Sequence, residues 1–167
     1  PVAIMVGNGK GAKNGILFKT SASLENVGKT SIVVLDKTGT ITNGNPVVTD
    51  IITAENVREE ELLQYAFSLE IKSEHPLAKA IVLYAQEKNL KAKEITDFKV
   101  LSGSGITAKV DGKILSGGNQ KFIGEEITSS LSLKAAALSE QGKTPIYFIL
   151  DNKLLGLIAV ADTIKED

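Results

Sequence analysis

The chain has 167 residues, which is enough for one domain or for one domain with part of a second. Its 19 basic and 20 acidic residues leave a formal charge of -1, so no basic surplus favours binding to nucleic acid or to an anionic membrane surface. The absence of cysteine and the single histidine exclude disulfides, cysteine-liganded zinc, thiol catalysis and histidine-rich metal sites. A hard, oxygen-liganded ion such as magnesium remains compatible with this composition.

Residues 1–30 form a mixed leading segment with a glycine-rich stretch from Gly7 to Gly11. The chain begins with Pro1 and not with Met, and we interpret it as a fragment of a longer protein. No apolar run approaches the ~20 residues of a bilayer crossing, and no signal peptide is recognisable. We expect no membrane insertion by the chain itself. A short helix is predicted across Ser21 to Val27.

An apolar, β-branched run from Ser31 to Leu35 leads directly into the sequence Asp36-Lys37-Thr38-Gly39-Thr40. Such a run predicts a buried strand, and ligands of open α/β sheets lie outside the carboxyl ends of their strands. A carboxylate there can accept a phosphoryl group, and the threonine hydroxyls can donate to its oxygens. The alternative is an Asp that merely starts a Thr/Gly turn. The five consecutive residues favour phosphoryl transfer.

The middle of the chain predicts a turn followed by two helices. Gly44-Asn45-Pro46 is a turn cluster and the best candidate for a domain boundary. Apolar residues at helical spacing predict a helix from 57 to about 70. A second helix is predicted from Pro76 to about Asn89, because proline is accepted in the first turn of a helix.

From Asp97 onward the pattern predicts mainly strands, with a helix across Ser130 to Ser139. Asp111-Gly112 and Asp151-Asn152 each separate two strand-like runs, which indicates hairpins with tight turns. The fold class predicted for this unit is α+β, an antiparallel sheet flanked by helices. The run that ends at Asp162 resembles the run that ends at Asp36, and we expect both to belong to one parallel sheet.

Several glycine motifs suggest other functions. The two Gly-Lys-Thr triplets, at Gly28 and at Gly142, lack the earlier glycine of a phosphate-binding P-loop and run into strands. Gly7-x-Gly9 follows an apolar run and precedes a strand that ends in an acid, as in a dinucleotide-binding domain. This glycine fingerprint is weak, but a dinucleotide-binding domain stays open as an alternative.

The sequence indicates three features that could contact a nucleotide base. Glu70 ends a predicted helix, where the helix dipole disfavours a negative charge, so hydrogen bonding to an adenine amino group is one reason for its position. Pro76 restricts His75 to a non-helical conformation from which its ring could stack on a purine. Gly103-Ser104-Gly105 indicates equally a tight connection or a close approach to a flat ligand.

Taken together, the pentapeptide at Asp36, the run Ser73-Glu74-His75-Pro76-Leu77, the Gly103-Ser104-Gly105 turn and the segment from Gly156 to Asp162 resemble the heavy-metal-transporting P-type ATPases. The resemblance implies an α+β insert domain within part of an α/β haloacid-dehalogenase-like phosphorylation domain. Residues 1–45 would then be the N-terminal part of the phosphorylation domain, 46–155 the nucleotide-binding domain, and 156–167 the return strand into the phosphorylation domain. The leading segment resembles that of copper exporters.

The resemblance also implies roles for individual residues. Asp36 would take the γ-phosphoryl group of ATP, with Lys37 and Thr38 in the same catalytic loop. Mg²⁺ would be held by the Asp36 carboxylate and the backbone carbonyl of Thr38. The implied nucleotide-binding residues are Glu70, His75, Gly103, Gly105, Asn119 and the hinge aspartate Asp162.

The implied partners are ATP and the actuator and transmembrane domains of the same pump, with this chain as the cytoplasmic part of an integral membrane protein. Copper is favoured over zinc by overall likeness alone. The chain lacks the downstream Gly-Asp-Gly-x-Asn-Asp segment, so we predict that it binds ATP without phosphorylating itself usefully. The other enzymatic alternative is a soluble haloacid-dehalogenase-type phosphatase. Thr38 stands where such enzymes carry a second Asp, which favours a long-lived phosphoenzyme.

Overall fold

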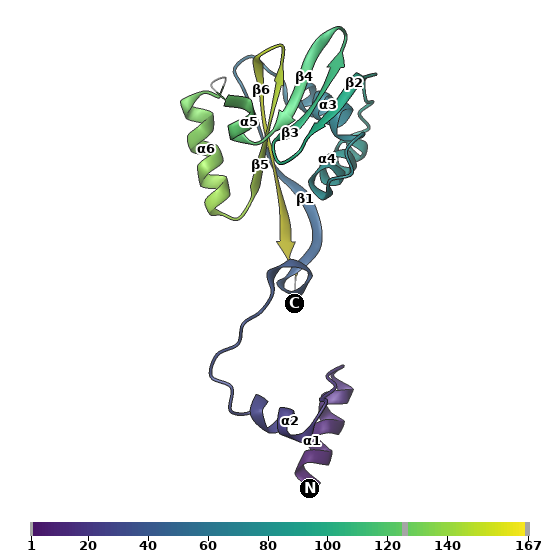
Figure 1. The fold of residues 1–167 in the computed structure, drawn as a ribbon, viewed down its shortest axis with the longest axis vertical. Coiled ribbons are helices and arrows are strands. Elements are labelled where there is room, and N and C mark those ends of the chain that lie inside the picture. Colours follow the sequence, from purple (N-terminus) through teal and green to yellow (C-terminus); the bar gives the residue numbers. More distant parts are fainter. Residues whose placement is uncertain (1, 125–126, 166–167) are drawn as a thin grey trace. The chain divides into compact units, whose positions relative to one another are not determined.

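The computed structural model describes residues 2–124 and 127–165, and the chain divides into two compact units, Pro1–Asp36 and Lys37–Asp167. The first unit consists of helices α1 (Val2–Lys13) and α2 (Ser21–Val27) and the segment that follows them (Figure 1). None of the helices in the described residues is long and apolar enough to cross a membrane.

The glycines of the leading segment lie inside helix α1, because residues 2–13 are helical throughout. A Cβ atom on Gly7 would lie 2.8 Å from Cδ2 of Leu24, and one on Gly11 would lie 2.9 Å from Cε2 of Phe18. These glycines therefore let α1 pack closely on the rest of its own unit. A dinucleotide-binding domain would need a strand directly before Gly7. Residues 2–6 are helical instead, so the structure disfavours that alternative.

The buried strand expected at residues 31–35 is wrong. This segment has no regular secondary structure, and Ile32 and Val34 are 79 % and 90 % exposed. A strand requires a neighbour to accept and donate its backbone hydrogen bonds. No strand in the described part of the chain pairs with residues 31–35. The apolar run therefore remains on the surface of the first unit.

The second unit is built on one antiparallel sheet of six strands in the order β1-β6-β5-β4-β3-β2 (Figure 1). This arrangement confirms the predicted α+β class. The strands are β1 (Thr42–Thr53), β2 (Thr96–Leu101), β3 (Gly105–Val110), β4 (Lys113–Gly118), β5 (Thr144–Leu150) and β6 (Lys153–Ile164).

The first and last strands differ from their predictions. Strand β6 pairs antiparallel with β1 and β5, so the expected parallel sheet shared by the runs ending at Asp36 and Asp162 is wrong. The expected turn at Gly44-Asn45-Pro46 lies inside β1, where the register with β6 shifts between Thr42 and Pro46. Proline is tolerated there because β1 is the edge strand of the sheet.

Both predicted hairpins are present. Asp111-Gly112 connects β3 to β4, and Asp151-Asn152 connects β5 to β6. All four turn residues have positive φ, between 46° and 77°, as a type I′ turn requires. These turns fix the register of the two hairpins.

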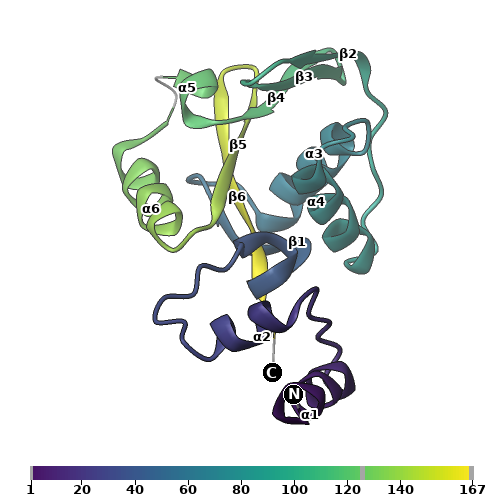
Figure 2. The same ribbon diagram turned by 60° about the horizontal axis from the view of Figure 1, so that its bottom comes forward.

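Helices cover both faces of the sheet (Figures 1 and 2). Helices α3 (Glu59–Glu70) and α4 (Pro76–Glu87), both predicted, pack on one face, and α5 (Gln120–Ile123) and α6 (Ser129–Glu140) pack on the other. Of these four, only α5 has no counterpart among the predicted helices. Successive residues of β6 alternate between the two cores: Ile158 joins the α3/α4 core and Leu157 the α5/α6 core, each 0 % exposed.

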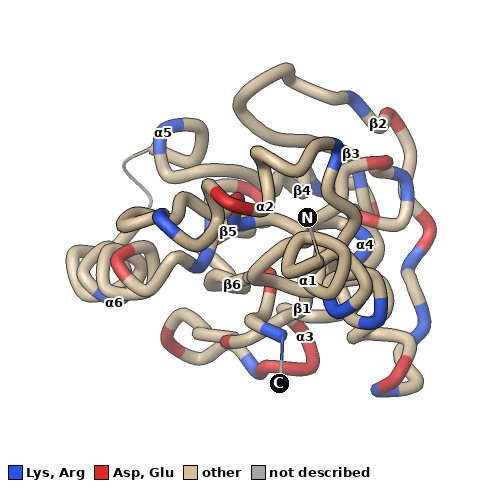
Figure 3. Tube along the Cα trace, turned by 90° about the horizontal axis from the view of Figure 1, so that it is seen from below, with Lys and Arg blue, Asp and Glu red and all other residues tan. Residues whose placement is uncertain are grey.

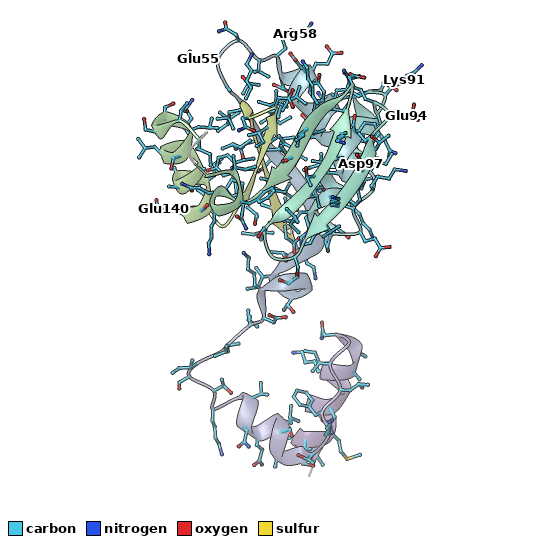
Figure 4. All side chains as sticks on the ribbon, turned by 45° about the horizontal axis from the view of Figure 1, so that its top comes forward. Glu55, Arg58, Lys91, Glu94, Asp97 and Glu140 are labelled. Atoms are coloured by element: carbon cyan, nitrogen blue, oxygen red, sulfur yellow. The ribbon has the colours of Figure 1, made fainter. Side chains whose placement is uncertain are left out.

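In the view of Figure 3, charged residues of both signs are interspersed along the chain. Glu140 on α6 and Asp97 on β2, both labelled in Figure 4, are exposed.

Candidate functional site

A pocket of about 340 Å³ opens where strand β4 separates from β5. Residues 115–118 of β4 pair with β5, but residues 144–146 of β5 pair only with β6, which leaves a gap at this end of the sheet. The pocket walls are the C-terminal end of α3, the start of α4, the β2–β3 turn, the end of β4 and the start of β5. The lining residues are Glu70, Ser73, His75, Leu77, Ala78, Val100, Leu101, Gly103, Ser104, Gly105, Ile106, Gly117, Gly118, Asn119, Thr144, Pro145 and Ile146.

Glu70 is the last residue of α3 and is only 5 % exposed. Apolar pocket walls, including Leu77 and Ile146, surround the space that it faces. Burial raises the pKa of its carboxyl to about 7, because desolvation disfavours the charged form. The negative end of the helix dipole opposes ionisation at this position as well. A large fraction of Glu70 is therefore a neutral acid near neutral pH.

His75 is the N-cap residue of α4, and its Nδ1 accepts a hydrogen bond of 3.2 Å from the backbone N–H of Leu77. An accepting Nδ1 places the proton of the neutral ring on Nε2. His75 is otherwise exposed and lines the pocket, so Nε2–H and the ring faces remain available to a ligand. Proline at the first helical position continues the helix from this cap, as the sequence predicted.

The two glycines of the β2–β3 turn are required for different reasons. Gly103 has φ of 73°, a left-handed conformation that a side chain would strain, although the space around it is open. A Cβ on Gly105 would lie 2.3 Å from the carbonyl oxygen of Gly117, where no atom fits. The turn therefore presents bare backbone to the pocket, as a close approach to a flat ligand requires.

Sequence reasoning missed Gly117 and Gly118, which form the opposite part of this wall. A Cβ on Gly118 would lie 2.5 Å from the carbonyl oxygen of Ser104, so the backbones of β3 and β4 touch here. Two consecutive glycines directly after a predicted strand are the signal that could have identified them, because glycine in or beside a strand marks a close approach. The adjacent Asn119 was predicted and also lines the pocket.

The remaining predicted residues do not line the pocket. Lys37 and Thr38 belong to an irregular turn, residues 37–41, of the second unit, and Asp36 belongs to the first. Asp162 lies near the end of β6, where its Oδ2 accepts hydrogen bonds from the backbone N–H of Gly44 and from the hydroxyl of Thr42. The structure thus separates a nucleotide-sized pocket from the pentapeptide turn and its strand connections.

The turn at residues 37–41 is fastened to the end of β6. Nζ of Lys165 donates to the carbonyl oxygen of Gly39 at 2.9 Å, and the backbone N–H of Lys165 donates to the carbonyl oxygen of Ile41 at 3.0 Å. Thr42, only 1 % exposed, accepts from the backbone N–H of Gly39 at 3.2 Å and lies 3.1 Å from the carbonyl oxygen of Lys37. In the described residues, no group of three or more His, Cys, Asp or Glu side chains is arranged to hold a metal.

Known proteins resemble the chain along almost its whole length. The haloacid dehalogenase-like hydrolase family matches residues 30–167. A copper-exporting P-type ATPase of Staphylococcus saprophyticus is 46% identical over 99% of the chain, and a probable copper-importing P-type ATPase A of Enterococcus hirae is 43% identical over 100% of it. The chain spans 20% and 23% of these two relatives.

Two solved structures of P-type ATPases also resemble the chain. A zinc-transporting PIB-type ATPase in its E2.Pi state covers 99% of the chain with a TM-score of 0.83 and 36% identity, and the match spans 27% of that structure. The N-domain of HMA6, a copper-transporting P-type ATPase, covers 70% of the chain with a TM-score of 0.59 and 30% identity, and 99% of that domain is matched. The chain therefore belongs to the haloacid dehalogenase-like hydrolase family and, within it, to the heavy-metal P-type ATPases.

Proposed function

We propose that this chain is the ATP-binding part of a copper-translocating P-type ATPase, with the pocket described above as the site of the adenosine moiety. The observation that carries the proposal is that one pocket gathers Glu70, His75, Gly103 and Gly105 from three separate segments of the chain. The volume of about 340 Å³ suits a nucleoside, and its walls combine apolar surface with a few polar groups, as small-molecule sites do.

The polar groups of the pocket suit adenine in particular. A neutral carboxyl offers one donor and one acceptor, and both hydrogen-bonding edges of adenine offer an amino donor beside a ring-nitrogen acceptor. Glu70, buried and with its pKa raised to about 7, can present that form. The exposed ring of His75 can stack on the purine, and the bare backbone at Gly103 and Gly105 admits a flat ring.

We propose that Asp36 is the phosphoryl acceptor in the complete pump. A carboxylate oxygen of Asp36 forms a bond to the γ-phosphorus while the bond from that phosphorus to the bridging oxygen breaks, and ADP leaves with that oxygen. Lys37 contributes positive charge beside the acceptor. The Asp36 carboxylate and the carbonyl of Thr38 are the hard oxygen donors that magnesium prefers, and when bound the ion neutralises charge on the phosphates.

The cargo that we propose is copper, because the relatives that match the whole chain are named as copper ATPases. Within the longer protein, the chain would work on the cytoplasmic side with the actuator and transmembrane domains of the same pump. Thr38 supports a pump and not a phosphatase, since no second carboxylate stands there to hydrolyse the phosphoenzyme.

The test is calorimetric titration of the 167-residue chain with ATP, with His75→Asn as the decisive variant. Asn is a good N-cap residue and keeps the hydrogen bond to Leu77, but it has no aromatic ring. We expect ATP affinity to fall by about tenfold, because stacking of a base on a ring contributes about 1–3 kcal/mol. His75→Ala loses the cap as well and should bind no better than His75→Asn.

Titrations with other ligands separate the alternatives. NAD binding stronger than ATP binding would favour the dinucleotide-binding domain, and rapid hydrolysis of a simple phosphate ester would favour the phosphatase. Absence of ATP binding, or equal ATP binding by the wild type and His75→Asn, would remove the pocket assignment.

A further inference from the structure

We propose that Asn119 is a positioning residue of the adenosine pocket, which holds the Gly103–Gly105 turn in place and does not bind the ligand through its own amide. This inference rests on the proposed function of the pocket. Asn119 lines the pocket at the N-terminus of α5, so a direct contact with the nucleotide would be the simpler assignment. Its hydrogen bonds point to the other role.

Each end of the Asn119 amide makes one hydrogen bond within the protein. Nδ2 donates to the carbonyl oxygen of Gly103 at 3.1 Å, and Oδ1 accepts from the backbone N–H of Phe122 at 2.9 Å. The backbone N–H of Asn119 donates to the carbonyl oxygen of Ser104 at 3.1 Å. Asn119 thus donates two hydrogen bonds to the turn, one to the carbonyl oxygen of Gly103 and one to that of Ser104. The third hydrogen bond, from Phe122, caps helix α5.

The turn is closed by a hydrogen bond of 2.9 Å from the backbone N–H of Ser104 to the carbonyl oxygen of Leu101, but its tip at Gly103 has few other restraints. The Cβ position of Gly103 has no protein atom within 4 Å, and its φ of 73° is one that glycine adopts at no steric cost but does not enforce. Across the wall, Phe122 packs against both close-approach glycines, since Cβ atoms on Gly105 and Gly118 would lie 2.8 Å and 2.7 Å from its Cδ1. This wall is therefore held by the side-chain amide of Asn119, the N-cap residue of α5, and by the ring of Phe122 within α5.

This role predicts a distinctive pattern of ligand affinities. If Asn119 shapes the wall beside the base, its loss weakens ATP, ADP, AMP and adenosine by the same factor. If its amide instead contacted phosphate, the loss would grow with the number of phosphates and adenosine would be unaffected. The two roles thus differ in the ratio of ATP to adenosine affinity.

The experiment uses Asn119→Asp and Asn119→Ser in the full chain. Both side chains can cap α5, but Asp has no donor for the Gly103 carbonyl and Ser is too short to reach it. We expect Asn119→Ser to bind all four ligands about five- to tenfold more weakly, the typical effect of one lost hydrogen bond in a preorganised site. Asn119→Asp should weaken adenosine, which has no phosphate for the new carboxylate to repel, by the same factor. In the free protein, the backbone amide NMR signals of Gly103 and Gly105 should shift.

Asn152→Asp is the matched control, because Asn152 is an exposed turn residue with φ of 61° that does not line the pocket. It should bind as the wild type does. Unchanged affinity in both Asn119 variants, or a loss confined to the phosphate-bearing ligands, would overturn the inference. If the wild type itself does not bind ATP, the proposed function fails, and the Gly103 and Gly105 signals still decide whether Asn119 holds the turn.

Discussion

Two runs of the chain, residues 31–35 and residues 146–150, are both mainly apolar and have opposite structures. In the first, Val34 is 90 % exposed and no strand forms. In the second, Phe148 is 0 % exposed at the centre of β5, between β4 and β6. The difference teaches that an apolar run becomes a strand only where the fold supplies at least one neighbouring strand for its backbone hydrogen bonds.

The same contrast separates the two functional regions. The walls of the adenosine pocket all belong to the second unit, and their glycines, caps and buried acid are already in place. Asp36, the phosphoryl acceptor that we propose, follows the run without strand partners and belongs to the first unit. We therefore expect ATP binding to depend on the second unit and to be insensitive to Asp36.

The largest expected effect compares the two runs directly. Phe148→Ala removes a fully buried ring from the α3/α4 core, and we expect the free energy of unfolding to fall by about 3–5 kcal/mol. Val34→Ala removes an exposed side chain and should change it by less than about 0.5 kcal/mol. Urea unfolding followed by circular dichroism measures both. An equal loss in the two variants would mean that residues 31–35 are packed and that the contrast is false.

The next effect concerns the buried acid of the pocket and depends on pH. The folded-state pKa of Glu70, raised to about 7 from the ordinary 4.5, means that folding favours the protonated form. Its contribution to stability is complete below pH 4.5 and is lost as the pH rises through about 7, by on the order of 3 kcal/mol. Glu70→Gln should therefore become more stable than the wild type by a margin that grows between these pH values.

Unfolding at intervals from pH 4.5 to pH 8 measures that margin. Glu74→Gln is the control, because Glu74 is an exposed glutamate near the same pocket, and its replacement should leave the wild-type profile in place. The amide introduced by Glu70→Gln also offers a donor and an acceptor, so this variant should bind ATP with little dependence on pH. A margin between wild type and Glu70→Gln that is constant with pH would show that Glu70 is ionised in the folded protein.

Much of the second unit followed from the sequence because its signals are local. Asp111-Gly112 and Asp151-Asn152 specify their turns through positive φ, and the periodicity of α3 and α4 specifies their buried faces. Strand β1 did not follow, because Pro46 indicates a turn unless the strand is known to lie at an edge. Whether a strand lies at the edge of a sheet, or whether residues 31–35 have a neighbouring strand, depends on the whole fold. A short stretch of sequence does not contain that information.

The candidate site was predictable to the same extent. Glu70 and His75 were found from helix-end chemistry, which is local. The pairing of Gly105 with Gly117 was not, because it depends on which strands meet, and the hydrogen bonds of Asn119 depend on the unpredicted helix α5. Residue identity thus indicated where a ligand could bind, and only the fold shows which side chains are committed to holding the pocket.

The smallest effect concerns the connection between the turn at residues 37–41 and the sheet. Thr42 is 1 % exposed, and its hydroxyl bonds to Asp162 and accepts from the N–H of Gly39. Thr42→Val keeps the shape and removes both hydrogen bonds, so we expect a loss of about 1–3 kcal/mol in unfolding free energy.

Thr49→Val is the matched control, because Thr49 is on the same strand and its hydroxyl bonds to Asp50 in an exposed position, where the loss should be within about 0.5 kcal/mol. Amide hydrogen exchange at Gly39 and Gly44 should accelerate in Thr42→Val and stay unchanged in Thr49→Val. Since Asp162 also accepts from Gly44, the loss of the Thr42 hydroxyl leaves a half-buried carboxylate with one partner fewer, and that carboxylate joins β6 to the start of β1. If Gly39 exchanges equally fast in all three proteins, the sheet does not hold the turn, and the stable part of the second unit begins at β1 and not at Lys37.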